Sequence, residues 1–189
     1  MSGTDAIVIG ASAGAVEALS RVLPALPAGY PLPLLVVVHI PADRIDLMAP
    51  LFASRCQVAV KEAEDKEPIR PGVIYFAASN YHLLVEADRS LSLSSDEPVN
   101  FSRPSIDVLF ESAADAYGEG LVGVILTGAN EDGAEGLAAV VAAGGAGVVE
   151  DPATAFVATM PAAALAHCPG ARPMSLDAIA DLLVDLGTA

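Results

Sequence analysis

Short uninterrupted apolar runs recur along the chain, and three of them dominate its hydropathy pattern: residues 6–9, 34–38 and 121–126. Runs of this length are typical of strands that are buried on both faces of a parallel sheet. The first two are followed by apolar residues at helical spacing, over 16–23 and 43–53. This order of strand, helix, strand and helix predicts a parallel sheet with crossover helices.

The pattern changes in the middle of the chain. Four short extended segments, at 58–63, 72–77, 81–85 and 91–93, are separated by charged or turn-forming residues. Pro71-Gly72 and Ala87-Asp88-Arg89 are turn signals. We therefore expect a small antiparallel meander, with a hairpin around Asp88, appended to the parallel sheet.

The last third returns to alternating helices and strands. A helix is predicted from Ser102 to Tyr117, with Ser102 as its cap and Pro104 in its first turn. Further elements are expected as a strand at 147–150 and helices at 135–143, from Pro161 to near His167, and at 175–186. The predicted fold is α/β, a three-layer, doubly wound, mostly parallel sheet with an antiparallel hairpin or meander. Because 189 residues suit one domain, we expect a single domain over residues 1–189.

Charge excludes two classes of partner. Nine Lys and Arg residues stand against 24 Asp and Glu residues, which gives a formal net charge of −15. Such a field repels a phosphate backbone and an acidic membrane surface, and no basic stripe interrupts it. The longest uncharged stretch of small apolar residues, 136–149, is too short to span a bilayer. We expect neither nucleic-acid binding nor direct membrane insertion.

The cysteines and two of the histidines give no sign of a cofactor. Cys56 and Cys168 are isolated, and neither His82 nor His167 has a partner at metal-ligand spacing, so we expect no metal. The glycine spacing after the first strand also departs from the dinucleotide fingerprint, and no cofactor is predicted. Unpaired cysteines and the lack of a secretory signal before the first strand predict a cytoplasmic protein.

The stretch Gly10-Ala11-Ser12-Ala13-Gly14 joins the first predicted strand to the first predicted helix. In a strand-to-helix turn, small neighbours let the backbone bend sharply and leave a serine hydroxyl exposed, which is the geometry of a nucleophile elbow. Backbone N–H groups at the start of such a helix face incoming negative charge. The same hydroxyl could instead serve only as a helix N-cap, and these residues alone leave both interpretations open.

Two more polar residues follow the ends of predicted parallel strands. His39 comes directly after 34–38, and Asp132 lies in the loop after 121–126. In an open α/β sheet, ligands bind beyond these strand ends, so Ser12, His39 and Asp132 could form a catalytic triad. Each also has a structural interpretation, His39 as a hydrogen-bonded histidine and Asp132 as a helix cap.

Four separated motifs carry a family resemblance that is more specific than the elbow alone. They are Ile9-Gly10-Ala11-Ser12-Ala13-Gly14, Val38-His39-Ile40-Pro41, Arg103-Pro104-Ser105-Ile106-Asp107-Val108-Leu109-Phe110, and Leu126-Thr127-Gly128 with Asp132-Gly133-Ala134. From about residue 5 to about residue 185, the chain resembles the catalytic domain of the CheB-type chemotaxis protein-glutamate methylesterases.

The resemblance implies a serine hydrolase that demethylates glutamate methyl esters on the cytoplasmic helices of chemoreceptors, with glutamine deamidation as a side activity. It implies a triad of Ser12, His39 and Asp132, and an oxyanion site made by the N–H groups of Ala13 and Ala129. A receptor methyltransferase is a further partner to consider. Because the first strand begins within ten residues of Met1, we expect no receiver domain and no control by phosphorylation in cis.

The chain departs from the family pattern next to two of these residues. The family usually has Ser-Thr-Gly-Gly at the nucleophile and Thr-Gly-Met-Gly-x-Asp-Gly at the acid loop. This chain has Ser12-Ala13-Gly14-Ala15 and, from 127 to 133, Thr-Gly-Ala-Asn-Glu-Asp-Gly. Two alternatives therefore remain: a catalytically weakened module that binds receptors or a methyltransferase, and an esterase or amidase for another acyl substrate.

Overall fold

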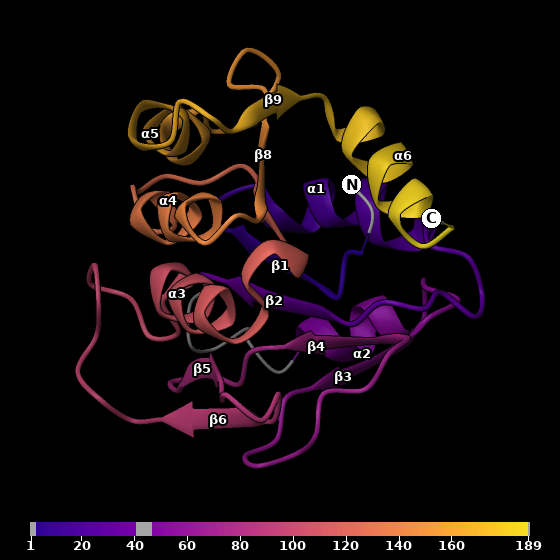
Figure 1. Cartoon of the computed structure of the whole chain (residues 1–189). Coiled ribbons are helices and arrows are strands. Elements are labelled where there is room, and N and C mark those ends of the chain that lie inside the picture. The colour runs from indigo at the N-terminus through magenta and orange to yellow at the C-terminus, as the bar shows by residue number, and fades with distance from the viewer. Residues whose placement is uncertain (1–2, 41–46, 189) are drawn as a thin grey trace.

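A central parallel sheet organises the molecule (Figure 1). The computed structural model describes residues 3–40 and 47–188. In this part of the chain, seven strands pair side by side in the order β3-β4-β2-β1-β7-β8-β9, and every pair is parallel. Their bounds are β1 Ala6–Ala11, β2 Leu34–Val38, β3 Ala59–Glu62, β4 Val73–Phe76, β7 Leu121–Ile125, β8 Ala146–Glu150 and β9 Arg172–Met174.

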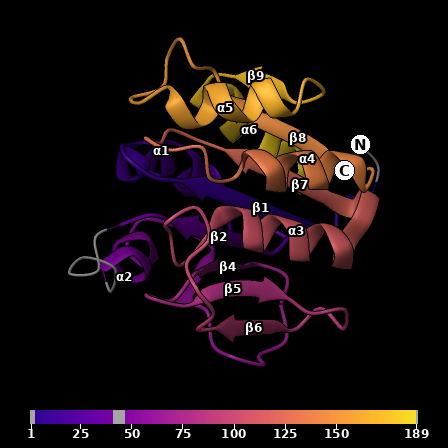
Figure 2. The ribbon, with the colours of Figure 1, turned by 90° about the vertical axis from the view of Figure 1, so that its left-hand side faces the viewer.

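Helices cover both faces of this sheet (Figures 1 and 2). The helices are α1 Ala15–Val22, α2 Met48–Ala53, α3 Ile106–Tyr117, α4 Ala134–Ala142, α5 Thr159–His167 and α6 Leu176–Leu186. On one face, Leu19, Phe52 and Leu183 bring α1, α2 and α6 into one buried apolar cluster. On the other face, Phe110 and Leu137 bring α3 and α4 into a second cluster, to which α5 also contributes. The predicted three-layer, doubly wound fold is confirmed.

The predicted meander is partly wrong. Of the four predicted segments, β5 (His82–Val85) and β6 (Leu91–Ser94) pair antiparallel, as the hairpin expected around Asp88. The segments predicted at 58–63 and 72–77 are instead β3 and β4, which extend the parallel sheet. In β4, Ile74, Tyr75 and Phe76 are all buried, because the strand has a neighbour on each side and layers on both faces. A continuous apolar run is the signature of such a strand.

Two helix starts and one strand also differ from the prediction. The helix expected from Ser102 begins at Ile106, with Ser105 as its N-cap residue, so Ser102 and Pro104 precede the helix. Strand β9 was not predicted, since Arg172–Met174 has no apolar run and forms a three-residue edge. The helix expected over 43–53 is present as α2 from Met48, and residues 41–46 lie outside the described part of the chain. Over the described ranges, none of the helices has the length and apolar character that a membrane crossing needs.

The chain reverses its direction of travel across the sheet at β1. From β1 it proceeds through β2 to the β3 edge, then returns to β7 on the other side of β1. The carboxyl ends of β2, β1 and β7 are therefore adjacent, and the loops that leave them meet at the switch point where open α/β sheets bind ligands.

Candidate active site

Ser12 follows the last residue of β1, at a turn that small residues make possible. Gly14 has φ +84° and is the N-cap residue of α1, and the helix has no side-chain cap bond. The interpretation of Ser12 as a helix cap is therefore wrong. The Ser12 N–H donates to the carbonyl of Thr127 at 2.9 Å, and the Thr127 hydroxyl donates to the carbonyl of Ala13 at 2.8 Å. These bonds tie the elbow to the loop that follows β7.

His39 is held at the end of β2 by the same sheet. Its N–H donates to the Ala11 carbonyl at 3.0 Å. Its Nε2 lies 2.7 Å from Oδ2 of Asp132, which comes from the loop after β7. The His39 side chain is 12% exposed, while that of Asp132 is fully buried. An imidazole that meets a buried carboxylate on one side and solvent on the other has the geometry of a general base with its orienting acid.

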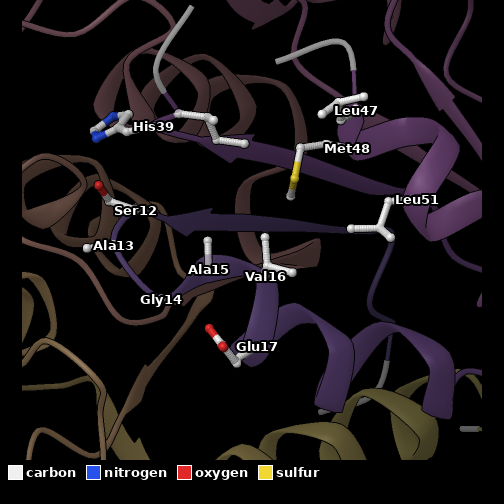
Figure 3. Close-up of a pocket in the computed structure, with 11 residues that line it drawn as sticks. Ser12, Ala13, Gly14, Ala15, Val16, Glu17, His39, Leu47, Met48 and Leu51 are labelled. Carbon is white, nitrogen blue, oxygen red and sulfur yellow. The ribbon is translucent and has the colours of Figure 1, made fainter. Parts of the chain in front are cut away.

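Ser12 and His39 line one pocket of about 380 Å³. Figure 3 shows the Ser12 hydroxyl directed toward the His39 ring, beside the other residues that line this pocket. Much of the remaining wall is apolar, with Ile40, Met48 and Leu51 from the segment after β2 and from α2. The pocket can therefore take an aliphatic chain with its polar end at the serine.

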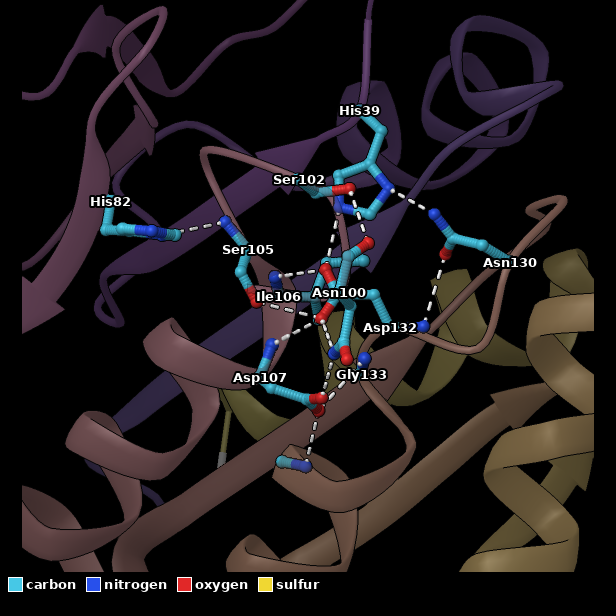
Figure 4. Close-up of polar contacts among 11 residues, drawn as sticks. His39, His82, Asn100, Ser102, Ser105, Ile106, Asp107, Asn130, Asp132 and Gly133 are labelled. Atoms are coloured by element: carbon cyan, nitrogen blue, oxygen red, sulfur yellow. Dashed lines mark hydrogen bonds and ion pairs between the residues drawn. The ribbon is translucent and has the colours of Figure 1, made fainter. Parts of the chain in front are cut away.

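Asp132 is surrounded by hydrogen-bond donors (Figure 4). Besides His39, four groups donate to its two oxygens: Asn100 Nδ2 at 2.9 Å, Ser105 Oγ at 2.8 Å, Ile106 N–H at 2.6 Å and Asp107 N–H at 3.2 Å. Burial alone would raise the pKa of Asp132, but the bonds from His39, Asn100 and the Ile106 N–H outweigh it and hold this pKa well below its ordinary value. The carboxylate is ionised at neutral pH.

The two backbone donors show that Asp132 does cap a helix, although a different one from the helix expected. Ile106 and Asp107 lie in the first turn of α3, so Asp132 caps α3 although it follows that turn by about 25 residues in sequence. Asp107 in turn accepts the N–H groups of Gly133 at 2.9 Å and Gly136 at 2.6 Å, at the start of α4. The capping is therefore reciprocal. Asp132, just before α4, caps α3, and Asp107, in the first turn of α3, caps α4. Helix dipoles favour negative charge at both N-termini.

Asp107 carries a different electrostatic balance from Asp132. Its burial is the largest influence and raises its pKa to about 6; the neighbouring Asp132 carboxylate acts in the same direction, against the bonds from Gly136, Asn100 and Gly133. Asn100 bridges the pair, since its Nδ2 lies 2.7 Å from Asp107 Oδ2 and 2.9 Å from Asp132 Oδ1. One amide group therefore separates two carboxylates.

Sequence reasoning missed the residues that support Asp132. Asn100, Ser105 and Asp107 were not singled out as polar groups of the site, although two of them lie in the motif from Arg103 to Phe110. Ser105 is held by a further residue, because its N–H donates to Nδ1 of buried His82 at 3.1 Å. A stretch that carries several polar residues just before an apolar helix was the available signal.

The two residues expected to bind an oxyanion belong to two different loops. Ala13 belongs to the elbow, and Ala129 is an exposed residue of the loop after β7. Within residues 3–40 and 47–188, neither N–H donates to a backbone carbonyl among the turn and loop hydrogen bonds. In the same ranges, no three His, Cys, Asp or Glu side chains gather in a group that could hold a metal ion.

Comparison with known proteins agrees with this geometry. The family model described as CheB methylesterase matches residues 7–183. The chain is 32% identical to the Thermotoga maritima CheB methylesterase catalytic domain, with a TM-score of 0.92 over 98% of this chain and all of that one.

Two sequence relatives differ in length. A protein of Leptospira interrogans, provisionally named protein-glutamate methylesterase/protein-glutamine glutaminase, is 47% identical over 96% of this chain and 94% of its own. One from Archaeoglobus fulgidus with the same name is 39% identical over 84% of this chain, but that match covers only 46% of the relative. The chain belongs to the CheB methylesterase family.

Proposed function

We propose that this protein is a serine hydrolase that removes methyl groups from glutamate methyl esters on the cytoplasmic helices of chemoreceptors. The observation that carries the proposal is the 2.7 Å contact between His39 Nε2 and Asp132, next to a pocket that Ser12 shares with His39. Relatives named protein-glutamate methylesterase/protein-glutamine glutaminase support the substrate class and a second activity on glutamine. The enzyme acts in the cytoplasm, where a receptor methyltransferase would supply its substrate.

The mechanism assigns one role to each polar group. Ser12 Oγ attacks the ester carbonyl carbon while its proton passes to Nδ1 of His39, because Nε2 is engaged by Asp132. The ionised Asp132 stabilises the imidazolium that forms. The carbonyl oxygen, now an oxyanion, is bound by the N–H groups of Ala13 and Ala129.

Collapse of the tetrahedral intermediate releases methanol, which takes the proton from His39 and leaves a glutamyl ester on Ser12. Water then repeats the sequence at the same base and restores the free serine. The apolar wall formed by Ile40, Met48 and Leu51 excludes bulk water from the aliphatic part of the glutamyl side chain.

The test is mass spectrometry of a methylated receptor domain after incubation with the wild-type protein and with Ser12→Ala. We expect loss of methyl groups with the wild type and a fall of about 10⁴–10⁶ in kcat for the variant, because the members of a triad act as a unit. Ser54→Ala, an exposed serine at the end of α2, serves as the matched control and should keep full activity. Unchanged demethylation by Ser12→Ala contradicts the proposal.

A second candidate is a binding module that docks receptor helices or a methyltransferase with little turnover. The altered loop at Ala129, Asn130 and Glu131 favours it, because this loop carries one oxyanion donor. Saturable binding of the receptor domain without loss of methyl groups supports this candidate. Turnover of small esters without activity on the receptor would instead indicate an esterase or amidase for another acyl substrate.

A further inference from the structure

The side chain of Asn130 contacts the catalytic histidine directly (Figure 4). Its Nδ2 lies 3.2 Å from Nδ1 of His39, and its Oδ1 accepts the Asp132 N–H at 3.2 Å. Asn130 thus lies between the base and the backbone of the acid, on the side of the ring opposite to the Asp132 carboxylate.

The Asp132 N–H fixes which way the amide of Asn130 points. A backbone N–H can only donate, so the amide presents its oxygen to it and its NH₂ group to His39. Rotation of the amide by 180° would place two donors against each other at Asp132 and lose this bond. The NH₂ group also only donates, so Nδ1 of His39 must be the acceptor.

This contact selects one tautomer of the ring. Nδ1 offers a lone pair to Asn130, and Nε2 faces the acceptor oxygen of Asp132, so the hydrogen bonds favour the tautomer with its proton on Nε2. This is the tautomer that a general base needs. The geometry, however, leaves the base nitrogen engaged with an amide.

Nδ1 has a single lone pair, and two groups need it. Ser12 must donate its proton there, because the other ring nitrogen is bound to Asp132. In the described part of the chain, the partner of Nδ1 is Asn130 rather than Ser12. Once Nδ1 carries a proton, the NH₂ group of Asn130 also faces another donor, so Asn130 must leave this position as the serine is activated.

We infer that Asn130 is a positioning residue that holds His39 in the competent tautomer in the free enzyme and competes with Ser12 for its base nitrogen. The inference deepens the proposed function and rests on it, since Ser12 is there the nucleophile. Asn130 is half-buried and its neighbours Ala129 and Glu131 are exposed, so the loop has room to move when a substrate carbonyl binds the Ala129 N–H. Substrate binding and release of the base are thereby coupled.

Asn130→Ala and Asn130→Asp test the inference with opposite expected signs. The alanine variant removes the competitor, while the Asp132 carboxylate still keeps the proton on Nε2 of His39. Ser12 should therefore react faster with phenylmethanesulfonyl fluoride, roughly 3- to 10-fold, as expected from the loss of one neutral hydrogen bond. In that reaction Oγ bonds to sulfur, fluoride leaves, and the serine proton passes through His39 to solvent. The aspartate variant presents an acceptor that favours a proton on Nδ1, so its rate should fall below that of the wild type.

Nitrogen-15 NMR of histidine-labelled full-length protein gives a second measurement that does not depend on turnover. The Nδ1 resonance of His39 should move toward that of a free acceptor nitrogen in Asn130→Ala, and toward that of a protonated nitrogen in Asn130→Asp. His82 is buried, bonds to Glu97 and Ser105 and does not contact Asn130, so its resonances serve as an internal reference for the fold. A comparison with His39→Gln assigns the signals.

Two results would overturn the inference. One is an Nδ1 resonance in Asn130→Ala that coincides with the wild-type resonance, which shows that the amide does not occupy this nitrogen. The other is a slower reagent rate in Asn130→Ala, which shows that Asn130 assists Ser12. A wild-type protein whose Ser12 takes no label would refute the nucleophile of the proposed function, while the Nδ1 resonance would still decide the role of Asn130.

Discussion

Replacement of Asp132 by asparagine is expected to lower both activity and stability. The two effects have different causes, which follow from the hydrogen bonds of the two carboxylate oxygens. An asparagine supplies one oxygen and one NH₂ group where the wild type has two acceptors. If the NH₂ group takes the Oδ1 position, it meets Asn100, Ser105 and the Asp107 N–H. The Oδ2 position has fewer donors, so the NH₂ group should lie there.

In that orientation the NH₂ group faces His39 and the Ile106 N–H. His39 can respond only by accepting at Nε2, which moves its proton to Nδ1 and removes the lone pair that Ser12 needs. A wrong tautomer of this kind costs about 10⁴ in kcat, equivalent to about 5.4 kcal/mol of transition-state stabilisation. The Ile106 N–H, buried and without an acceptor, costs about 1–3 kcal/mol of folding free energy.

The assay combines methanol release from a methylated receptor domain with thermal unfolding followed by circular dichroism. The melting temperature of Asp132→Asn should fall by roughly 2–12 °C, given the scaling for a domain of this size. Asp181→Asn, which changes an exposed carboxylate on α6, is the matched control and should alter neither quantity. A rate within tenfold of the wild type would refute the tautomer argument, and an unchanged melting temperature would refute the argument from Ile106.

Two further predictions concern residues around Asp132, namely the packing of Ile106 and the protonation of Asp107. In Gly10→Ala, the new Cβ would clash with Cγ2 of buried Ile106, so the variant should lose about 1–3 kcal/mol of unfolding free energy, measured by chemical denaturation. In a double-mutant cycle with Ile106→Ala, the double variant should be less destabilised than the sum of the two single changes, and additive losses would place the strain elsewhere. Because burial raises the pKa of Asp107 to about 6, the folded state holds a proton that the unfolded chain releases near pH 4, and the unfolding free energy from this group should fall as the pH rises from about 4 to about 6. Denaturation across that range should show this slope in the wild type and lose it in Asp107→Asn, and the same slope in both would exclude Asp107 as its source.

The parallel sheet could be predicted because its strands are buried on both faces and appear as continuous apolar runs, as in Leu34–Val38. The same rule applied to Val73–Phe76 would have placed β4 in the sheet, but nearby turn signals and short segments favoured a meander. Strand β9 has no such pattern. It pairs with β8 along three residues at an edge, and backbone pairing of this kind depends on tertiary contacts that hydropathy does not record.

The candidate triad was predictable because Ser12, His39 and Asp132 each follow a strand end, and topology brings those ends together. The groups around Asp132 were not, since Asn100 and Ser105 lie in a connection whose path is set by packing rather than by periodicity. The contact of Asn130 with His39 was equally hidden. The sequence shows that Asn130 replaces a glycine of the family's acid loop. The contact of its amide with Nδ1 of His39 is visible only in the structure.

The reciprocal capping of α3 and α4 by Asp132 and Asp107 also affects local unfolding of the molecule. The first turns of both helices are joined through Asp107 and Asp132, so fraying of either turn releases the acid that orients His39. These groups are about 25 residues apart in sequence and form one small cooperative unit. Loss of catalysis under mild denaturation would then report the opening of this unit, and hydrogen exchange at Ile106 and Gly136 would follow the same event amide by amide.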